Sequence, residues 1–182
     1  MIEVSFLAAE LAFAVIWLLV RIAVWIRQRK IVWKREATLL LMYVNLAVII
    51  RFVFFPRELV NGSVQPLYIY TDMKEAPALQ VNLIPFVRLF DFAYIRDFIW
   101  NVTGNVAMFI PSGIVLPIVY KGLDKWHLVM LAGVSISLII EILQLPMMSR
   151  ASDIDDLILN SFGVLIGYGI YVTMRYIHGR VK

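Results

Sequence analysis

The sequence contains no cysteine. This absence excludes disulfide bonds, thiolate metal sites and a cysteine nucleophile. Histidine is almost as scarce, because its two copies, His127 and His178, lie far apart in the chain and argue against a histidine-based zinc site. The sequence also has no Ser-His-Asp set and no glycine-rich phosphate loop, so any enzymatic activity would depend on carboxylates.

Charged residues are also few. They make up 16% of the 182 residues, whereas a soluble domain usually carries about a quarter. Hydrophobic residues make up 62%, the mean hydropathy is +0.82, and the apolar residues are gathered into long blocks. The composition therefore predicts an all-α fold, a polytopic membrane helical bundle that forms one domain over residues 1–182.

Five apolar segments have the length of a membrane-spanning helix. Four of them lie at about 37–55, 98–120, 126–145 and 157–177. The fifth, at about 4–26, contains Glu10, which we expect to point into the bundle, and Arg21, which we expect to extend towards the nearby helix end. Basic residues follow this segment instead of preceding it, so it does not resemble a signal peptide.

Basic residues indicate which ends of these segments face the cytoplasm. They gather in the first connection (Arg27, Arg29, Lys30, Lys34, Arg35), in the third (Lys121, Lys125) and at the C-terminus (Arg175, Arg180, Lys182). If the chain crosses the membrane five times, all three groups of basic residues lie on the same side of the membrane. We therefore predict a multi-pass protein of the cell membrane with the N-terminus outside and the C-terminus in the cytoplasm. No nucleic-acid motif accompanies the basic residues, so the lipid bilayer is the predicted partner and nucleic acid is not.

The connection at about 56–97 is unusually long and lies outside in this topology. Loops of this length are usually functional. Its later part, Val81-Asn-Leu-Ile-Pro-Phe86, is apolar and is broken by a proline. We expect this part to pack on the bundle near the outer interface, and a short amphipathic stretch to follow at about 87–96.

Polar residues lie near one end of the last three spans, where lipid would make them costly. The third span carries Asn101 and Asn105, the fourth carries Ser137, Glu141 and Gln144, and the fifth carries Asp153, Asp156 and Asn160. The spacings of three, four or seven residues put the members of each set on one helix face. In the predicted topology all three sets reach the same depth, where Asn82 and Arg150 can also approach. We therefore predict a polar pocket that faces the outer leaflet.

Structural roles compete with ligand binding at these positions. Asn101 and Asn105 can hydrogen-bond between helices, and the first-turn carboxylates of the last span suit the positive end of its dipole. Arg150 can pair with Asp153. Glu141 is the residue that a structural role explains least, because a carboxylate inside an apolar span is a functional candidate by default.

Small residues and caps have structural interpretations. Gly104, Gly113, Gly163 and Gly167 are expected to be packing residues, the last two as a GxxxG pair. Ser152 and Asp155 fit a capping box at the start of the last helix.

Four motifs follow one another along the chain. They are Asn82-Leu-Ile-Pro-Phe86, Asn101-x-x-Gly-Asn105-x-x-x-Phe109-x-Pro111-x-Gly113, Glu141-x-x-Gln144 and Arg150-x-x-Asp153-x-Asp155-Asp156-x-x-x-Asn160-x-x-Gly163-x-x-x-Gly167. In this order they resemble the VanZ family, membrane proteins named for a teicoplanin-resistance determinant of Gram-positive bacteria. The resemblance covers about residues 82–170. It implies a role in the cell envelope, with lowered susceptibility to teicoplanin and related lipid-bearing glycopeptide antibiotics, and it supplies no established reaction.

Three functions are left open by these residues. In the first, a non-catalytic resistance protein binds an envelope lipid, a peptidoglycan precursor or a lipoglycopeptide through Asn82, Asn101, Asn105, Gln144, Arg150 and Asn160. In the second, a membrane-embedded enzyme acts on an envelope lipid or a lipid-linked glycan. Glu141 would then be the general base, and Asp153 and Asp156 would orient a phosphate or bind a divalent cation such as Mg²⁺. The third is a small transporter, which five spans without an internal repeat favour least.

Overall fold

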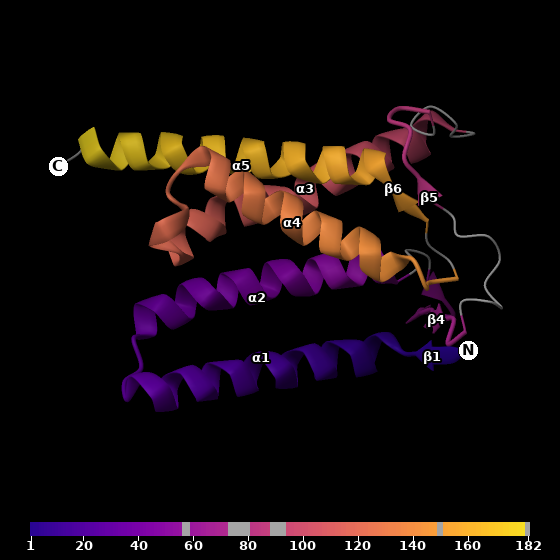
Figure 1. Cartoon of the computed structure of the whole chain (residues 1–182), viewed down its shortest axis with the longest axis horizontal. Coiled ribbons are helices and arrows are strands. Elements are labelled where there is room, and N and C mark those ends of the chain that lie inside the picture. Colours follow the sequence, from indigo (N-terminus) through magenta and orange to yellow (C-terminus); the bar gives the residue numbers. More distant parts are fainter. Residues whose placement is uncertain (56–58, 73–80, 88–93, 149–150, 181–182) are drawn as a thin grey trace. The chain divides into compact units, whose positions relative to one another are not determined.

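The structure is a computed structural model that describes residues 1–55, 59–72, 81–87, 94–148 and 151–180. Five long helices form the predicted spans (Figure 1): α1 (Phe6–Gln28), α2 (Trp33–Phe54), α3 (Ile95–Val119), α4 (Trp126–Gln144) and α5 (Ile154–Arg180). Each helix is long and apolar enough to cross a membrane. The prediction of an all-α membrane fold with five spans is therefore confirmed.

The chain forms two compact units, which are described separately. Unit 1 contains Met1–Gln80 and Gln144–Arg150, and unit 2 contains Val81–Leu143 and Ala151–Lys182. The prediction of a single domain over the whole chain stays a prediction.

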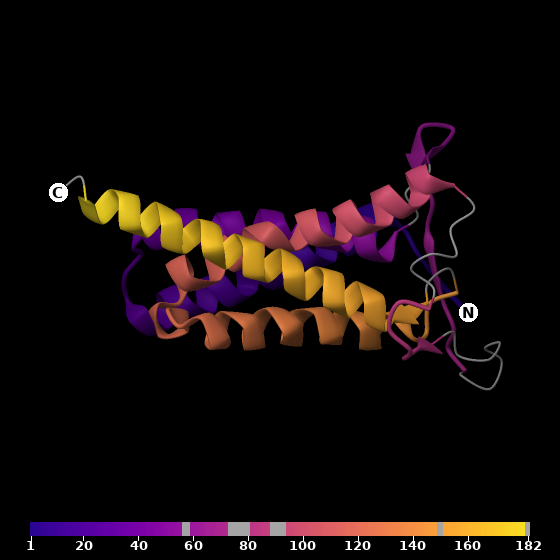
Figure 2. The ribbon, with the colours of Figure 1, turned by 90° about the horizontal axis from the view of Figure 1, so that it is seen from above.

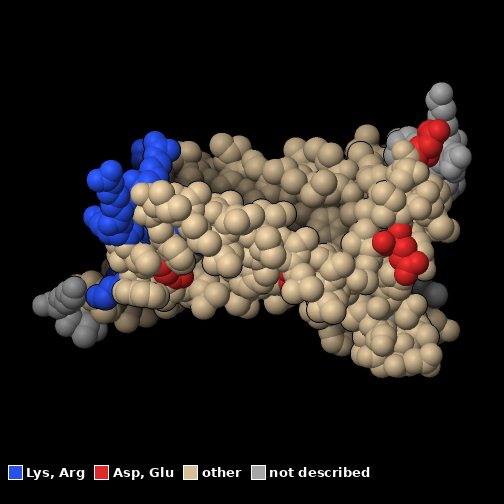
Figure 3. Space-filling view, turned by 90° about the horizontal axis from the view of Figure 1, so that it is seen from below, with Lys and Arg blue, Asp and Glu red and all other residues tan. Residues whose placement is uncertain are grey.

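Unit 1 is built on a hairpin of α1 and α2. The Phe13 ring of α1 stacks on the Tyr43 ring of α2 with centroids 5.1 Å apart, and the Trp17 ring lies 5.5 Å from the same tyrosine. The hairpin turns at Arg29, which has the left-handed φ of 51°. Figure 3 shows Lys and Arg side chains gathered over this turn, as the positive-inside pattern predicts for one membrane surface.

Arg21 extends towards the nearby end of α1, as predicted, because its partner Glu36 lies in the first turn of α2. Its guanidinium is buried in the hairpin and makes two hydrogen bonds to Glu36 of α2, with Nε–Oε2 at 2.9 Å and Nη2–Oε1 at 2.6 Å. The opposite charge on α2 satisfies the arginine where it lies. Glu10 is half-buried in α1, and its Oε1 has no hydrogen-bond partner within the described part of the chain.

Short strands complete unit 1. Strands β2 (Leu59–Val60) and β3 (Ser63–Val64) form a hairpin around Asn61 and Gly62, both of which have positive φ, as a tight hairpin turn requires. Strand β1 (Ile2–Val4) pairs antiparallel with β4 (Leu67–Ile69). The segment after α4 joins β4, because Met148 N donates to Tyr68 O and Tyr70 N donates to Pro146 O.

Unit 2 contains a close pair of parallel helices, α3 and α5. Gly163 faces Val106 and Gly167 faces Ile110, so the contacts advance together along both helices. A Cβ atom added to either glycine would collide with the carbonyl oxygen of the facing residue. The structure thus places these glycines where the GxxxG pattern predicts close backbone approach.

Helix α4 packs on α5 in the opposite direction (Figure 2). Gly133 meets the Val164 side chain, and Asn160 Nδ2 donates to Ser137 Oγ at 2.9 Å. Ser137 and Glu141 both lie on the buried face of α4, as their spacing predicts. A short helical turn, η1 (Lys121–Leu123), connects α3 to α4.

The start of α5 differs from the predicted capping box. Ser152 lies in strand β6 (Ser152–Asp153), which pairs in parallel with β5 (Val81–Asn82), and α5 begins at Ile154. Asp153 is the capping residue, because its Oδ1 accepts a hydrogen bond from Asp155 N at 2.9 Å. The prediction was wrong because pairing with β5 keeps Ser152 and Asp153 extended.

Candidate functional site

Unit 2 gathers buried and half-buried polar side chains where α5 begins. Glu141 Oε2, from the last turns of α4, accepts a hydrogen bond from Asp153 N at 2.8 Å. Asn105, from α3, donates through Nδ2 to Asp156 Oδ1 of α5. We call the whole group the polar cluster, and its members are Asn82, Asn105, Glu141, Asp153, Asp155, Asp156 and Asn160. Segments far apart in the sequence thus bring amides and carboxylates together. It stays a prediction that one ligand pocket is shared by Asn105, Glu141 and Asp156.

Asn82 connects strand β5 to this cluster. Its Nδ2 donates to Asp153 Oδ1 at 2.9 Å, and its Oδ1 accepts from Ile84 N at 3.2 Å. Asp155 Oδ1 accepts from Phe86 N at 2.7 Å. The segment Val81–Phe86 was expected to pack on the bundle. It is attached to the start of α5 by its backbone and by Asn82, and residues 83–87 are exposed.

Two acceptors in the polar cluster lack a donor. Asp155 and Asn160 are 4% and 2% exposed, and Asp155 Oδ2 and Asn160 Oδ1 accept no hydrogen bond from the residues that the structure describes. Buried oxygens in proteins are usually bonded. The cluster is therefore rich in acceptors, and groups that bring N–H or O–H donors would complement it.

Asn101, Gln144 and Arg150 are the remaining predicted site residues. Asn101 is half-buried one turn before Asn105, and no hydrogen bond joins its amide to the described residues. Gln144 belongs to unit 1, where its Nε2 donates to Val53 O at 3.2 Å. Arg150 lies outside the described residues, so its predicted role in ligand binding stays a prediction. Within the described ranges, no group of three or more His, Asp or Glu residues is arranged to hold a metal ion.

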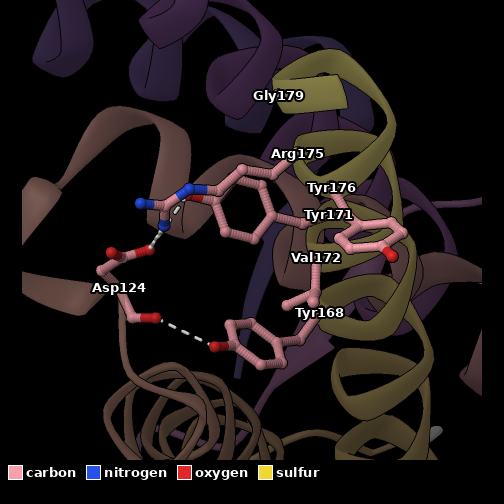
Figure 4. Close-up of a pocket in the computed structure, with 7 residues that line it drawn as sticks. All are labelled: Asp124, Tyr168, Tyr171, Val172, Arg175, Tyr176 and Gly179. Atoms are coloured by element: carbon pink, nitrogen blue, oxygen red, sulfur yellow. Dashed lines mark hydrogen bonds and ion pairs between the residues drawn. The ribbon is translucent and has the colours of Figure 1, made fainter. Parts of the chain in front are cut away.

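A second polar group lies at the opposite end of α5, and the sequence analysis missed it (Figure 4). Asp124 accepts hydrogen bonds through Oδ1 from Arg175 and from Tyr171, and its backbone oxygen accepts from Tyr168 at 2.9 Å. The Arg175 guanidinium, followed by the Tyr171 hydroxyl, lowers the pKa of the Asp124 carboxyl below its ordinary value. These side chains border an open depression of about 580 Å³. In the sequence, Tyr168, Tyr171 and Arg175 follow one another at spacings of three and four residues. This spacing puts them on one face of α5 and could have revealed the group.

The sequence model of the VanZ/LLP1 family matches residues 38–175. The chain belongs to this family. No curated protein and no solved structure matches it. The VanZ/LLP1 match contains the whole polar cluster and most of α2–α5, and it begins after α1. The resemblance inferred from the four motifs is thus confirmed for this VanZ/LLP1 chain, which is a membrane protein with five apolar helices.

Proposed function

We propose that this VanZ/LLP1 protein lowers susceptibility to teicoplanin and related lipid-bearing glycopeptides. The family is linked to teicoplanin resistance. The polar cluster binds an envelope lipid, a peptidoglycan precursor or the antibiotic itself from the outer leaflet. Membrane insertion with the N-terminus outside gives the cluster access to these molecules.

The observation that supports this proposal is the surplus of buried acceptors. Glu141 and the buried Asp155 lie with the half-buried Asp153 and Asp156, and Asp155 Oδ2 and Asn160 Oδ1 accept no hydrogen bond from the described residues. Peptidoglycan precursors, glycolipids and glycopeptides carry many O–H and N–H donors beside an apolar chain. Such a ligand would place its head group at the cluster and its chain among the lipids.

A membrane-embedded enzyme is the second candidate. It is favoured by the contact between Glu141 and Asp153, in which the Asp153 backbone N–H fixes the Glu141 carboxylate. General acid–base catalysis uses a side chain that is held in position, such as this carboxylate. Glu141 would accept the proton, and the substrate would be an envelope lipid or a lipid-linked glycan.

Replacement of Glu141 tests both candidates. Glu141→Gln keeps the shape and one acceptor oxygen for Asp153 N but removes the negative charge. We expect the variant to lose resistance, measured as teicoplanin susceptibility, while its membrane abundance and its melting temperature in detergent stay near those of the unchanged protein. A purely structural Glu141 would tolerate the change with a loss of about 1 kcal/mol and full resistance.

Asp97→Asn is the matched control. Asp97 lies in the first turn of α3, is half-exposed and is paired with Arg96, outside the polar cluster. This variant should keep resistance. Full resistance in the Glu141→Gln protein would show that the Glu141 carboxylate is neither base nor ligand, and it would refute the enzyme candidate. Mass spectrometry of lipid extracts separates the two candidates, because an enzyme leaves a product that falls in the variant, whereas a binding protein leaves the lipid pool unchanged.

A further inference from the structure

The segment Leu83–Val87 of unit 2 presents consecutive apolar side chains to its surroundings. Leu83 is 74% exposed and Ile84 is 64% exposed, and the three residues that follow are exposed as well. The segment contains no charged residue. A continuous exposed apolar surface on a rigid attachment indicates a surface that contacts something apolar.

The backbone of this segment is suited to an apolar medium. Ile84 N is bonded to Asn82 Oδ1, and Phe86 N is bonded to Asp155 Oδ1. Pro85, between them, has no N–H group. Three consecutive residues therefore present no unbonded backbone donor. In water the solvent would satisfy such donors, but lipid offers no partner, so a loop in lipid needs its N–H groups bonded internally.

The loop is held in one conformation. Phe86 has a φ of +66°, which is rare for a bulky residue. Such a conformation persists where the surroundings fix it. Here the surroundings are the pairing of β5 with β6 and the buried side chains of Asn82 and Asp155. The loop is consequently a fixed projection of unit 2.

The loop lies at the end of unit 2 where membrane-interface residues are exposed. The bond between Asn105 and Asp156 aligns the third turn of α3 with the first turn of α5. Trp100, five residues earlier on α3, lies about 7 Å further towards this end. It is exposed, together with Ile95 and Ile99. Exposed tryptophan is typical of the boundary between lipid and water.

From these observations we infer that Leu83–Val87 is an interfacial wedge, a loop whose side chains insert among the acyl chains of the bilayer leaflet at the start of α5. Asn82 and Asp155 are its positioning residues, because they bond its backbone donors and hold Phe86 in its left-handed conformation. The occupant of this surface is bilayer lipid. The inference does not depend on which head group or antibiotic the polar cluster binds.

Single-cysteine labelling tests the wedge. The chain has no cysteine, so Ile84→Cys gives one labelled position. With an environment-sensitive fluorophore there, and the full-length protein in phosphatidylcholine vesicles, we expect strong quenching by phospholipid with a nitroxide high on the acyl chain. We expect weak quenching by aqueous iodide. The matched control is Ser63→Cys in the exposed turn strand β3, which should show the reverse preference.

Two outcomes would overturn the inference. A label at position 84 that iodide quenches as strongly as the label at position 63 places the loop in water. A label shielded from both quenchers places it against protein. The single-cysteine series leaves Asn82 and Asp155 intact, so it decides the question without disturbing the buried side chains.

Two substitutions of Asp155 test whether this residue positions the loop. In the Ile84→Cys background, Asp155→Asn keeps an oxygen that accepts from Phe86 N, and it should keep the lipid quenching. Asp155→Ala removes the acceptor and should reduce lipid quenching about twofold while iodide quenching rises. Unchanged lipid quenching in the alanine protein would show that Asp155 does not position the loop.

Discussion

At the scale of the residue, asparagine amides are the partners of two carboxylates in the polar cluster. Asn82 bonds Asp153 and Asn105 bonds Asp156. An amide offers two N–H donors without adding a charge, so it satisfies a buried carboxylate while keeping its negative charge available. Each pair also joins two separate elements. It therefore holds those elements together in addition to giving the carboxylate a hydrogen-bond donor.

In the hairpin of unit 1, Arg21 and Glu36 carry opposite charges, and this pair gives a stability prediction. Arg21→Ala leaves the half-buried Glu36 carboxylate without its arginine partner, and we expect a loss of about 1–3 kcal/mol of unfolding free energy. The Arg21→Ala, Glu36→Ala double variant should lose less than the sum of the two single variants. Unfolding in detergent, analysed as a double-mutant cycle, measures this coupling.

Arg27→Ala is the control for that cycle, because Arg27 is exposed near the end of α1. It should change stability by less than about 0.5 kcal/mol. Additive losses for Arg21 and Glu36 would mean that the two hydrogen bonds contribute no net stability.

At the scale of the element, the seam between α3 and α5 determines where the polar cluster forms. Glycine at positions 163 and 167 lets the backbones approach, and the same parallel alignment brings Asn105 next to Asp156. Helix α3 runs unbroken through Pro111 and Pro117, so the seam is continuous along it. A change in the seam should therefore also disturb the cluster.

Gly167→Leu tests this dependence. A side chain there collides with the Ile110 carbonyl, and separation of the helices should cost about 1–3 kcal/mol or more, seen as a lower melting temperature in detergent. The matched variant is Gly169→Leu on the same helix, where an added Cβ meets nothing within 4 Å. Equal melting temperatures for the two variants would contradict a packing role for Gly167.

At the scale of the whole molecule, the distribution of basic residues predicts how the protein lies in the membrane. Gln28 ends α1 beside the basic turn, and Ser63 lies in the connection between α2 and α3. With the N-terminus outside, position 63 faces the exterior and position 28 faces the cytoplasm. The outer-leaflet placement of the polar cluster depends on this orientation.

Cysteine accessibility in intact cells decides the orientation. Ser63→Cys should react with a membrane-impermeant maleimide, and Gln28→Cys should react only after the membrane is permeabilised. Reaction at position 28 in intact cells would reverse the predicted topology. It would also remove the outer-leaflet site from the proposed function, while the interfacial wedge would move to the other leaflet.

The sequence alone determined the features that depend on local properties. Hydropathy and length located five helices, because a span is apolar over its own length wherever its neighbours lie. The GxxxG pattern located the close seam, and the four motifs located the family and the residues of the polar cluster. The three- and four-residue spacings also placed Ser137 and Glu141 on one buried face.

Only the tertiary structure decided which distant residues are partners. It paired Arg21 with Glu36, gave the capping role to Asp153, placed Gln144 in unit 1 and bonded Asp124 to Tyr171. It also showed that the segment after Asn82 is held by its backbone, with its apolar side chains outward. Spacing along a chain fixes which side chains share a face, but a hydrogen bond between segments depends on which atoms the packing brings within about 3 Å, and that distance is a property of the fold.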